Sequence, residues 1–103
     1  MFTVRIIPTD ARNLGDNKLA DVELHFTAAA GALAGLKLTG FTVCDATTWR
    51  YVTYPAYKGE SAEGVSFTTH FLRLIDEYQS YAGIRDRILD AYAEYERRTT
   101  EAL

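Results

Sequence analysis

The sequence predicts an α+β fold, in which an antiparallel sheet of about five strands carries one C-terminal helix packed on it. Three observations predict this class. Residues 2–71 hold short β-rich segments separated by turn residues, and residues 20–26 alternate apolar and polar side chains. Residues 80–97 repeat apolar side chains every three or four positions, which is the spacing of an amphipathic helix. Strands that follow one another before a single helix favour antiparallel pairing.

The first two strands are expected at residues 2–7 and 20–26. β-Branched residues dominate the first segment, and Pro8 ends it. Asp, Asn and Gly, which favour turns, dominate the connection at residues 10–18. The alternation in the second strand predicts one buried and one solvated face. The apolar side chains of that strand are Ala20, Val22, Leu24 and Phe26, and the polar ones are Asp21, Glu23 and His25.

Three more strands are expected at residues 36–46, 49–54 and 65–71. In the third strand the apolar alternation changes phase at Gly40, which is typical of a β-bulge. Pro55 has no N–H group, so we expect it to end the fourth strand. The polar residues that separate Pro55 from the fifth strand are interpreted as a loop.

A helix is expected from about residue 80 to about residue 97, with Ser80 as its N-cap. Residues 1–98 are expected to form a single domain, and residues 99–103 a frayed tail. The apolar stripe of the helix comprises Ile84, Ile88, Ala91, Tyr92 and Tyr95. One helix cannot cover five strands, and an unpaired strand edge invites pairing. We therefore expect a two-fold homodimer.

Composition restricts the class of function. The chain of 103 residues fits one domain, and its net charge of −3 argues against a strongly electrostatic nucleic-acid binder. The single cysteine, Cys44, excludes an internal disulfide and suits a reducing cytosol. The most apolar stretch is far shorter than the ~20 residues that a membrane helix needs. A soluble cytoplasmic protein without membrane contact is the expectation.

Few residues indicate chemistry. Asp21, Glu23 and His25 could hold a divalent metal, but alternate positions on a strand lie ~6.6 Å apart, so a solvated strand face is favoured. Cys44 has no histidine beside it in the sequence and is interpreted as a small buried side chain. His70, within the fifth strand, is interpreted as a structural histidine. No phosphate-binding loop, nucleophile elbow or zinc-protease motif occurs. We expect no enzyme activity, no catalytic residue, no metal and no cofactor.

Aromatic and cationic side chains gather around the end of the fourth strand. These residues are Trp49, Arg50, Tyr51, Tyr54, Tyr57 and Lys58. Aromatic rings interleaved with cations can stack on bases and contact phosphates. The same residue types are enriched at protein interfaces. Composition alone places a protein interface slightly ahead of a nucleic-acid site.

Five short motifs occur in a fixed order over residues 3–97. They are VRI at Val4–Ile6, FTVCDA at Phe41–Ala46, YVTYPAYKG at Tyr51–Gly59, GVSF at Gly64–Phe67 and IRDRILDAYAEYER at Ile84–Arg97. In this order the chain resembles the stage V sporulation protein G (SpoVG) family of small bacterial proteins. The resemblance implies an antiparallel sheet with a C-terminal helix, a dimer joined partly through strands, and sequence-selective nucleic-acid binding in a regulatory role connected with sporulation and septation.

The chain departs from the family pattern around the fourth strand. The Met-Pro-Ser of the family is replaced by Tyr54-Pro55-Ala56, and its basic pair or triplet is reduced to Lys58. Glu60 and Glu63 stand where the family is more basic.

Two hypotheses of function follow. The first is a homodimeric regulator that binds DNA or RNA weakly, with Arg50 and Lys58 on phosphates and Tyr54 or Tyr57 stacked on a base. The alternative is a non-catalytic protein-interaction module that kept the fold and lost nucleic-acid binding.

Overall fold

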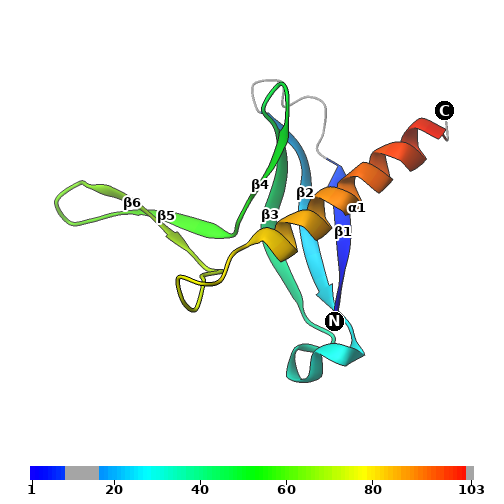
Figure 1. Cartoon of the computed structure of the whole chain (residues 1–103). Coiled ribbons are helices and arrows are strands. Elements are labelled where there is room, and N and C mark those ends of the chain that lie inside the picture. The colour runs from blue at the N-terminus through cyan, green and yellow to red at the C-terminus, as the bar shows by residue number, and fades with distance from the viewer. Residues whose placement is uncertain (9–16, 102–103) are drawn as a thin grey trace.

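The computed structural model describes residues 1–8 and 17–101. Four strands form one antiparallel sheet in the order β1-β2-β3-β4, and two further strands form a separate antiparallel hairpin (Figure 1). The elements are β1 (Phe2–Pro8), β2 (Lys18–Phe26), a 3-10 segment (Ala28–Leu33), β3 (Lys37–Asp45), β4 (Arg50–Thr53), β5 (Ala56–Glu60), β6 (Ser66–His70) and α1 (Ala82–Glu101). The α+β class with a single C-terminal α-helix is confirmed. Most of the connection expected at residues 10–18 lies outside the described residues.

The main sheet differs from the expectation in one respect. The segment at residues 65–71 is a strand, but it does not join the sheet as a fifth member. It pairs as β6 with β5, which is formed by residues expected to be a loop. Two residues, Tyr54 and Pro55, separate β4 from β5, and Pro55 cannot donate a ladder hydrogen bond. The chain therefore leaves the sheet at Pro55 and continues as a hairpin.

The bulge expected at Gly40 is present. Val22 lies opposite Phe41, but Leu24 lies opposite Leu38, so β3 contains one residue more than β2 over this stretch. Gly40 has a φ of 102°, in the region that favours glycine. The extra residue explains why the alternation of β3 changes phase.

Replacing Gly40 by alanine is expected to lower the free energy of unfolding by about 1–3 kcal/mol, because a side chain is strained at this φ. An added Cβ would also lie 3.1 Å from the Cβ of Pro55, which is tighter than ordinary contact. Gly83→Ala is the matched control, since Gly83 lies in the helix with open space around it. That control is expected to stabilise by a few tenths to about 1 kcal/mol. Urea unfolding curves in which both variants behave alike would contradict the prediction.

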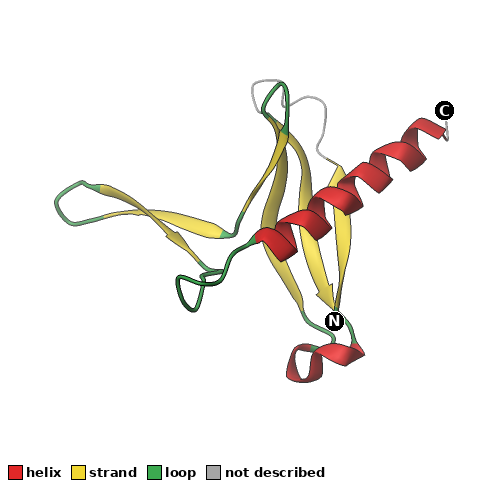
Figure 2. Ribbon diagram, viewed as in Figure 1, coloured by secondary structure: helices red, strands yellow, loops and turns green. Residues whose placement is uncertain are grey.

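The helix α1 lies across one face of the four-stranded sheet (Figure 2). The core between them comprises Ala20, Val22, Leu24, Phe41, Val43, Val52, Ile88 and Tyr92. The expected burial of Ile88 and Tyr92 is confirmed, whereas Ile84, expected to be buried with them, is half-buried. At the β1 edge, Arg87 donates a hydrogen bond of 2.7 Å to the carbonyl oxygen of Phe2 and places its guanidinium 3.8 Å from the Phe2 ring centroid. Within the described ranges, no helix is both long and apolar enough to cross a membrane.

The helix begins and ends later than expected. Ser80 lies two residues before Ala82, whose N–H donates to the Ser80 hydroxyl oxygen at 3.3 Å. At the other end, the Thr99 hydroxyl donates to the Tyr95 carbonyl oxygen, and Arg97 pairs with Glu101. These local contacts continue the helix to Glu101, so the first three residues of the expected tail are helical.

The hairpin projects away from the sheet (Figure 1). We call residues 56–70, which comprise β5, the tip loop and β6, the arm. The chain has a radius of gyration of 15.8 Å and extends over 52 × 40 × 26 Å. A compact domain of this length would have a radius of gyration of about 13 Å. The arm therefore adds surface that the domain does not need for its own core.

Candidate functional site

The root of the arm is fixed by aromatic and backbone contacts. Pro55 is buried against Gly40, and its carbonyl oxygen accepts a hydrogen bond of 2.9 Å from the Phe71 N–H. The Tyr54 ring lies 6.0 Å from the core residue Phe41 and 4.5 Å from Tyr81, which directly precedes α1. The arm is therefore attached to both the sheet and the start of the helix.

One face of the arm is aromatic. Tyr57 pairs with Thr69, and Gly59 pairs with Phe67, so these side chains share a face. The Tyr57 ring lies 6.2 Å from the Phe67 ring and 5.3 Å from the Phe71 ring. A Cβ on Gly59 would lie 2.5 Å from the Phe67 ring, which shows that this ring packs directly over the glycine backbone. We call Tyr57, Phe67 and Phe71 the aromatic face; each is more than two fifths exposed.

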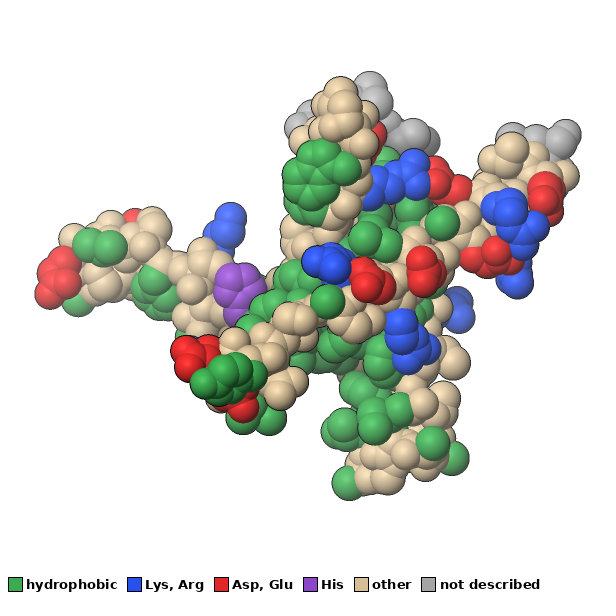
Figure 3. Space-filling view, in the orientation of Figure 1, with side chains coloured by type: hydrophobic (Ala, Val, Ile, Leu, Met, Phe, Trp, Pro, Cys, Tyr) green, Lys and Arg blue, Asp and Glu red, His purple; other side chains and the backbone are tan. Residues whose placement is uncertain are grey.

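The opposite face of the arm is polar. Lys58 lies opposite Thr68, and Glu60 lies opposite Ser66, and all four side chains are exposed. His70, opposite Ala56, is also exposed, so its interpretation as a structural histidine was wrong. The space-filling view shows acidic atoms at the outer end of the arm and a cation nearer its root (Figure 3).

The connection from the arm to α1 is also apolar at its surface. In residues 71–81, Ile75 is 95% exposed and Tyr78 is 87% exposed. Asp76 orders this loop, because its carboxylate accepts a hydrogen bond of 2.9 Å from the Tyr78 N–H. Seven of the eleven large apolar side chains that are exposed in the described part of the chain belong to the arm and this loop. These seven are Tyr57, Val65, Phe67, Phe71, Leu74, Ile75 and Tyr78.

Two of the predicted nucleic-acid residues are engaged within the fold. Arg50 makes a bidentate ion pair with Glu96 of α1, and its guanidinium lies 5.1 Å from the Tyr92 ring centroid. The Glu96 carboxylate raises the pKa of Arg50. Tyr54 is half-buried at the root of the arm, and burial raises the pKa of its hydroxyl. Both side chains hold the helix and the arm in place.

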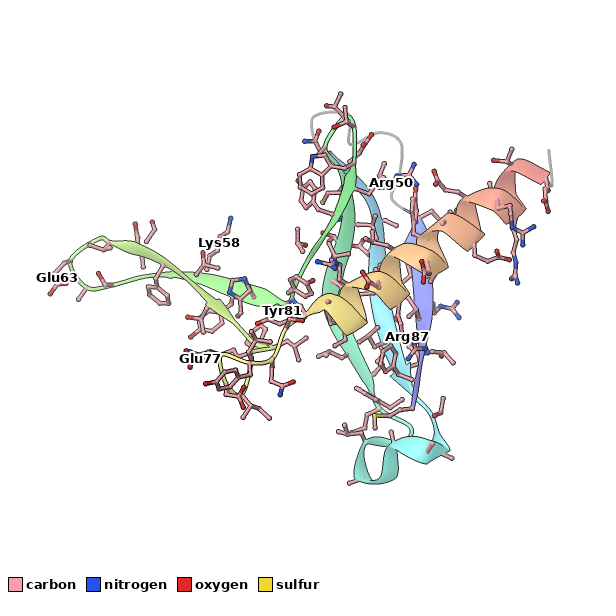
Figure 4. The ribbon with its side chains drawn as sticks, viewed as in Figure 1. Arg50, Lys58, Glu63, Glu77, Tyr81 and Arg87 are labelled. Carbon is pink, nitrogen blue, oxygen red and sulfur yellow. The ribbon has the colours of Figure 1, made fainter. Side chains whose placement is uncertain are left out.

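The other two predicted residues lie on the arm. Tyr57 belongs to the aromatic face and Lys58 to the polar face, since successive side chains of a strand point to opposite sides. Figure 4 shows Arg50 beside α1 and Lys58 on the arm, in separate parts of the molecule. The structure therefore does not gather Arg50, Tyr54, Tyr57 and Lys58 into one surface.

The row of Asp21, Glu23 and His25 lies on the sheet face away from α1. Glu23 accepts hydrogen bonds from His25, at 2.9 Å, and from Lys37, at 3.2 Å, and these two partners lower the pKa of its carboxyl. Asp21 pairs with Lys18. Within the described ranges, no group of three His, Cys, Asp or Glu side chains is arranged to hold a metal ion.

Sequence reasoning missed the residues that give the arm its surface. The sequence predicts Phe67 and Phe71 in a fifth strand of the main sheet, and no local pattern singles out Ile75. The available signal was that Tyr57 and Gly59 share one alternation phase and that Phe67 takes the matching phase after the five-residue connection at residues 61–65. This pattern fits a hairpin with an aromatic ring over a glycine. No known protein family, curated protein or solved structure matches this chain.

Proposed function

We propose that this protein is a non-catalytic interaction module that works as a homodimer, with the aromatic face of the arm as the main contact. The observation that carries this proposal is the projecting hairpin, on which Tyr57 and Phe67, with Phe71 directly after β6, remain exposed and are covered by no other helix or strand of the described chain. Exposed aromatic clusters of this kind are typical of protein–protein contacts.

The low stability expected of the arm by itself supports the proposal that a partner covers it. An isolated two-stranded hairpin is at best marginally stable in water. Its single ladder of hydrogen bonds and its exposed apolar face contribute too little free energy to offset the conformational entropy that is lost when the hairpin forms. Aromatic and backbone contacts hold the arm to the rest of the described chain at its root, through Tyr54, Pro55 and Phe71. A contact that covers Tyr57 and Phe67 would supply the missing burial.

A second copy of the chain is the occupant that the surface favours. The arm and the loop at residues 71–81 carry both signs of charge, with the cation Lys58 in the arm and the carboxylates Asp76 and Glu77 in the loop. Two such surfaces related by a two-fold axis can place cations of one copy against carboxylates of the other. A stable interface needs about 800 Å² from each partner. The seven exposed apolar side chains between residues 57 and 78 would contribute to that area.

Sedimentation velocity over a concentration series tests the dimer. At micromolar concentration the wild-type chain is expected to sediment as a species of twice the 11.5 kDa chain mass. A single 11.5 kDa species across the series would contradict the proposal.

Weak nucleic-acid binding in a cytoplasmic regulator of the SpoVG type is the second candidate function. The observation that favours it is the exposed Lys58 on the polar face, with His70 on the same face and Arg73 shortly after it in the chain. Glu60 lies on that face too, and Glu63 marks the tip of the arm (Figure 4). With so few cations, the affinity is expected to be low and its salt dependence shallow.

Replacing Lys58 by glutamate is expected to weaken binding to every oligonucleotide sequence alike, because a phosphate contact carries no base information. Lys37→Glu, on the main sheet, makes the same charge change and is expected to have little effect. Titration of labelled single- and double-stranded oligonucleotides at low salt measures this. No binding by the wild type, or equal binding by the wild type and Lys58→Glu, would exclude the second candidate and leave the interaction module.

A further inference from the structure

A polar hollow of about 430 Å³ lies where the arm meets the loop before α1. It is lined by Thr68, Thr69, His70, Arg73, Leu74 and Tyr81. β6 supplies the first three residues, the loop supplies Arg73 and Leu74, and Tyr81 directly precedes the helix. Figure 4 places Tyr81 at the start of α1, beside the root of the arm.

The lining is rich in hydrogen-bond donors. The Arg73 guanidinium offers up to five N–H groups, and the His70 ring offers at least one. The β5–β6 ladder adds backbone donors. The Phe71 N–H donates to the Pro55 carbonyl oxygen, so it points toward β5. In an antiparallel pair, successive N–H groups of a strand point alternately toward and away from the partner strand. The N–H groups of Thr68 and His70 therefore lie on the outer edge of β6, away from β5.

The Arg73 guanidinium gives the lining of the hollow a positive charge. None of its six lining residues carries a carboxylate. Arg73 has no acidic partner among residues 1–8 and 17–101, unlike Arg50 and Arg97, which are ion-paired. Asp76 lines a neighbouring, more apolar hollow, to which Arg73, Leu74 and Tyr81 also contribute.

The start of α1 adds to this charge. The helix runs for 20 residues from Ala82, and its first turn contains no acidic side chain. The N-terminal end of a helix carries a partial positive charge from its unpaired N–H groups. Tyr81 brings that end to the border of the hollow.

We propose that this hollow binds a phosphate group, held by Arg73, His70 and the outer-edge N–H groups of β6. Guanidinium and backbone N–H donors form charge-assisted hydrogen bonds to phosphate oxygens, and Arg does so through two parallel bonds. Lys58 shares a face with His70 and provides a further cation for a ligand that extends along the arm.

The phosphate site is independent of the homodimer and would give the second candidate function its phosphate contact. The group can come from a small phosphorylated molecule or from a nucleic-acid backbone. Because the hollow and the aromatic face involve different side chains, a change at Arg73 is expected to leave the dimer intact.

Backbone amide NMR tests the site with two probes, inorganic phosphate and a single-stranded oligonucleotide, each titrated at constant ionic strength in chloride buffer. Both are expected to shift the amides of Thr68, His70 and Arg73. Arg73→Gln is expected to weaken binding about tenfold, since it removes a charge-assisted contact. Arg98→Gln, which removes the same charge near the C-terminal end of α1, is expected to change it less than about twofold.

Each outcome decides a point. Shifts with both probes support the site and a ligand that includes small phosphates, whereas shifts with the oligonucleotide alone support the site and assign the nucleic-acid backbone as the source. Absence of shifts at these three amides with both probes, or equal effects of Arg73→Gln and Arg98→Gln, would overturn the proposal. Sedimentation of Arg73→Gln as a dimer shows that a failure of the phosphate site is separate from a failure of the homodimer.

Discussion

Replacing Ile88 by alanine is expected to lower the free energy of unfolding by about 2–4 kcal/mol. Ile88 is fully buried and lies in the middle of the apolar stripe of α1, in the core cluster with Val22 and Phe41. α1 is the only α-helix of the described chain that covers the sheet. No further layer of structure lies behind it that could move in and fill the cavity left by the substitution.

Asp90→Ala is the matched control for this prediction, since Asp90 lies two residues further along the same helix and is exposed. Alanine at an exposed helix position is expected to change stability by no more than about 0.5 kcal/mol. Urea unfolding of the two variants beside the wild type measures the difference. A loss of less than about 0.5 kcal/mol for Ile88→Ala would mean that the helix uses another face.

Replacing Phe67 and Phe71 together by serine is expected to convert the proposed dimer to a monomer, with a rise in the dimer dissociation constant of about 30-fold or more. A buried aromatic anchor at the centre of an interface contributes about 2 kcal/mol or more, so the loss of even one of the two corresponds to a factor of about 30. In a two-fold interface each substitution occurs twice, so the effect is amplified.

Trp49→Ser controls for the loss of an exposed aromatic side chain. Trp49 is 60% exposed, precedes β4 and stacks on Tyr51, away from the aromatic face. We expect this variant to remain a dimer. The double serine variant should keep a cooperative unfolding transition, because neither phenylalanine belongs to the core cluster. A double variant that sediments like the wild type would place the dimer contact elsewhere.

Most of the fold follows from signals that act over a few residues. The alternation at residues 20–26 places Ala20, Val22 and Leu24 on the buried face, as the structure has them. The three- and four-residue spacing predicts the buried stripe of the helix, and Gly40 marks the bulge of β3. These patterns could be read from the sequence because each records the local geometry of a strand or a helix.

The arm could not be predicted in the same way. The stretch Ala56–Glu60 contains Lys, Gly and Glu, which are weak β-formers, so it was interpreted as a loop. A strand with such a composition forms only because Ser66–His70 pairs with it. β6 could pair either with the outer edge of β4 or with β5. Because the chain turns out of the main sheet at Pro55, β6 pairs with β5.

The same division applies to the candidate site. The fold class, the buried faces of β2 and of the helix, and the clustering of aromatic and cationic residues around the end of β4 can be read from the sequence alone. Which of these side chains are available to a partner depends on how the elements pack. Arg50 is ion-paired with Glu96, 46 positions away in the sequence. Tyr57 and Lys58 lie on opposite faces of the arm. Pairings between distant segments depend on how the whole chain packs, and no local pattern of residues records them.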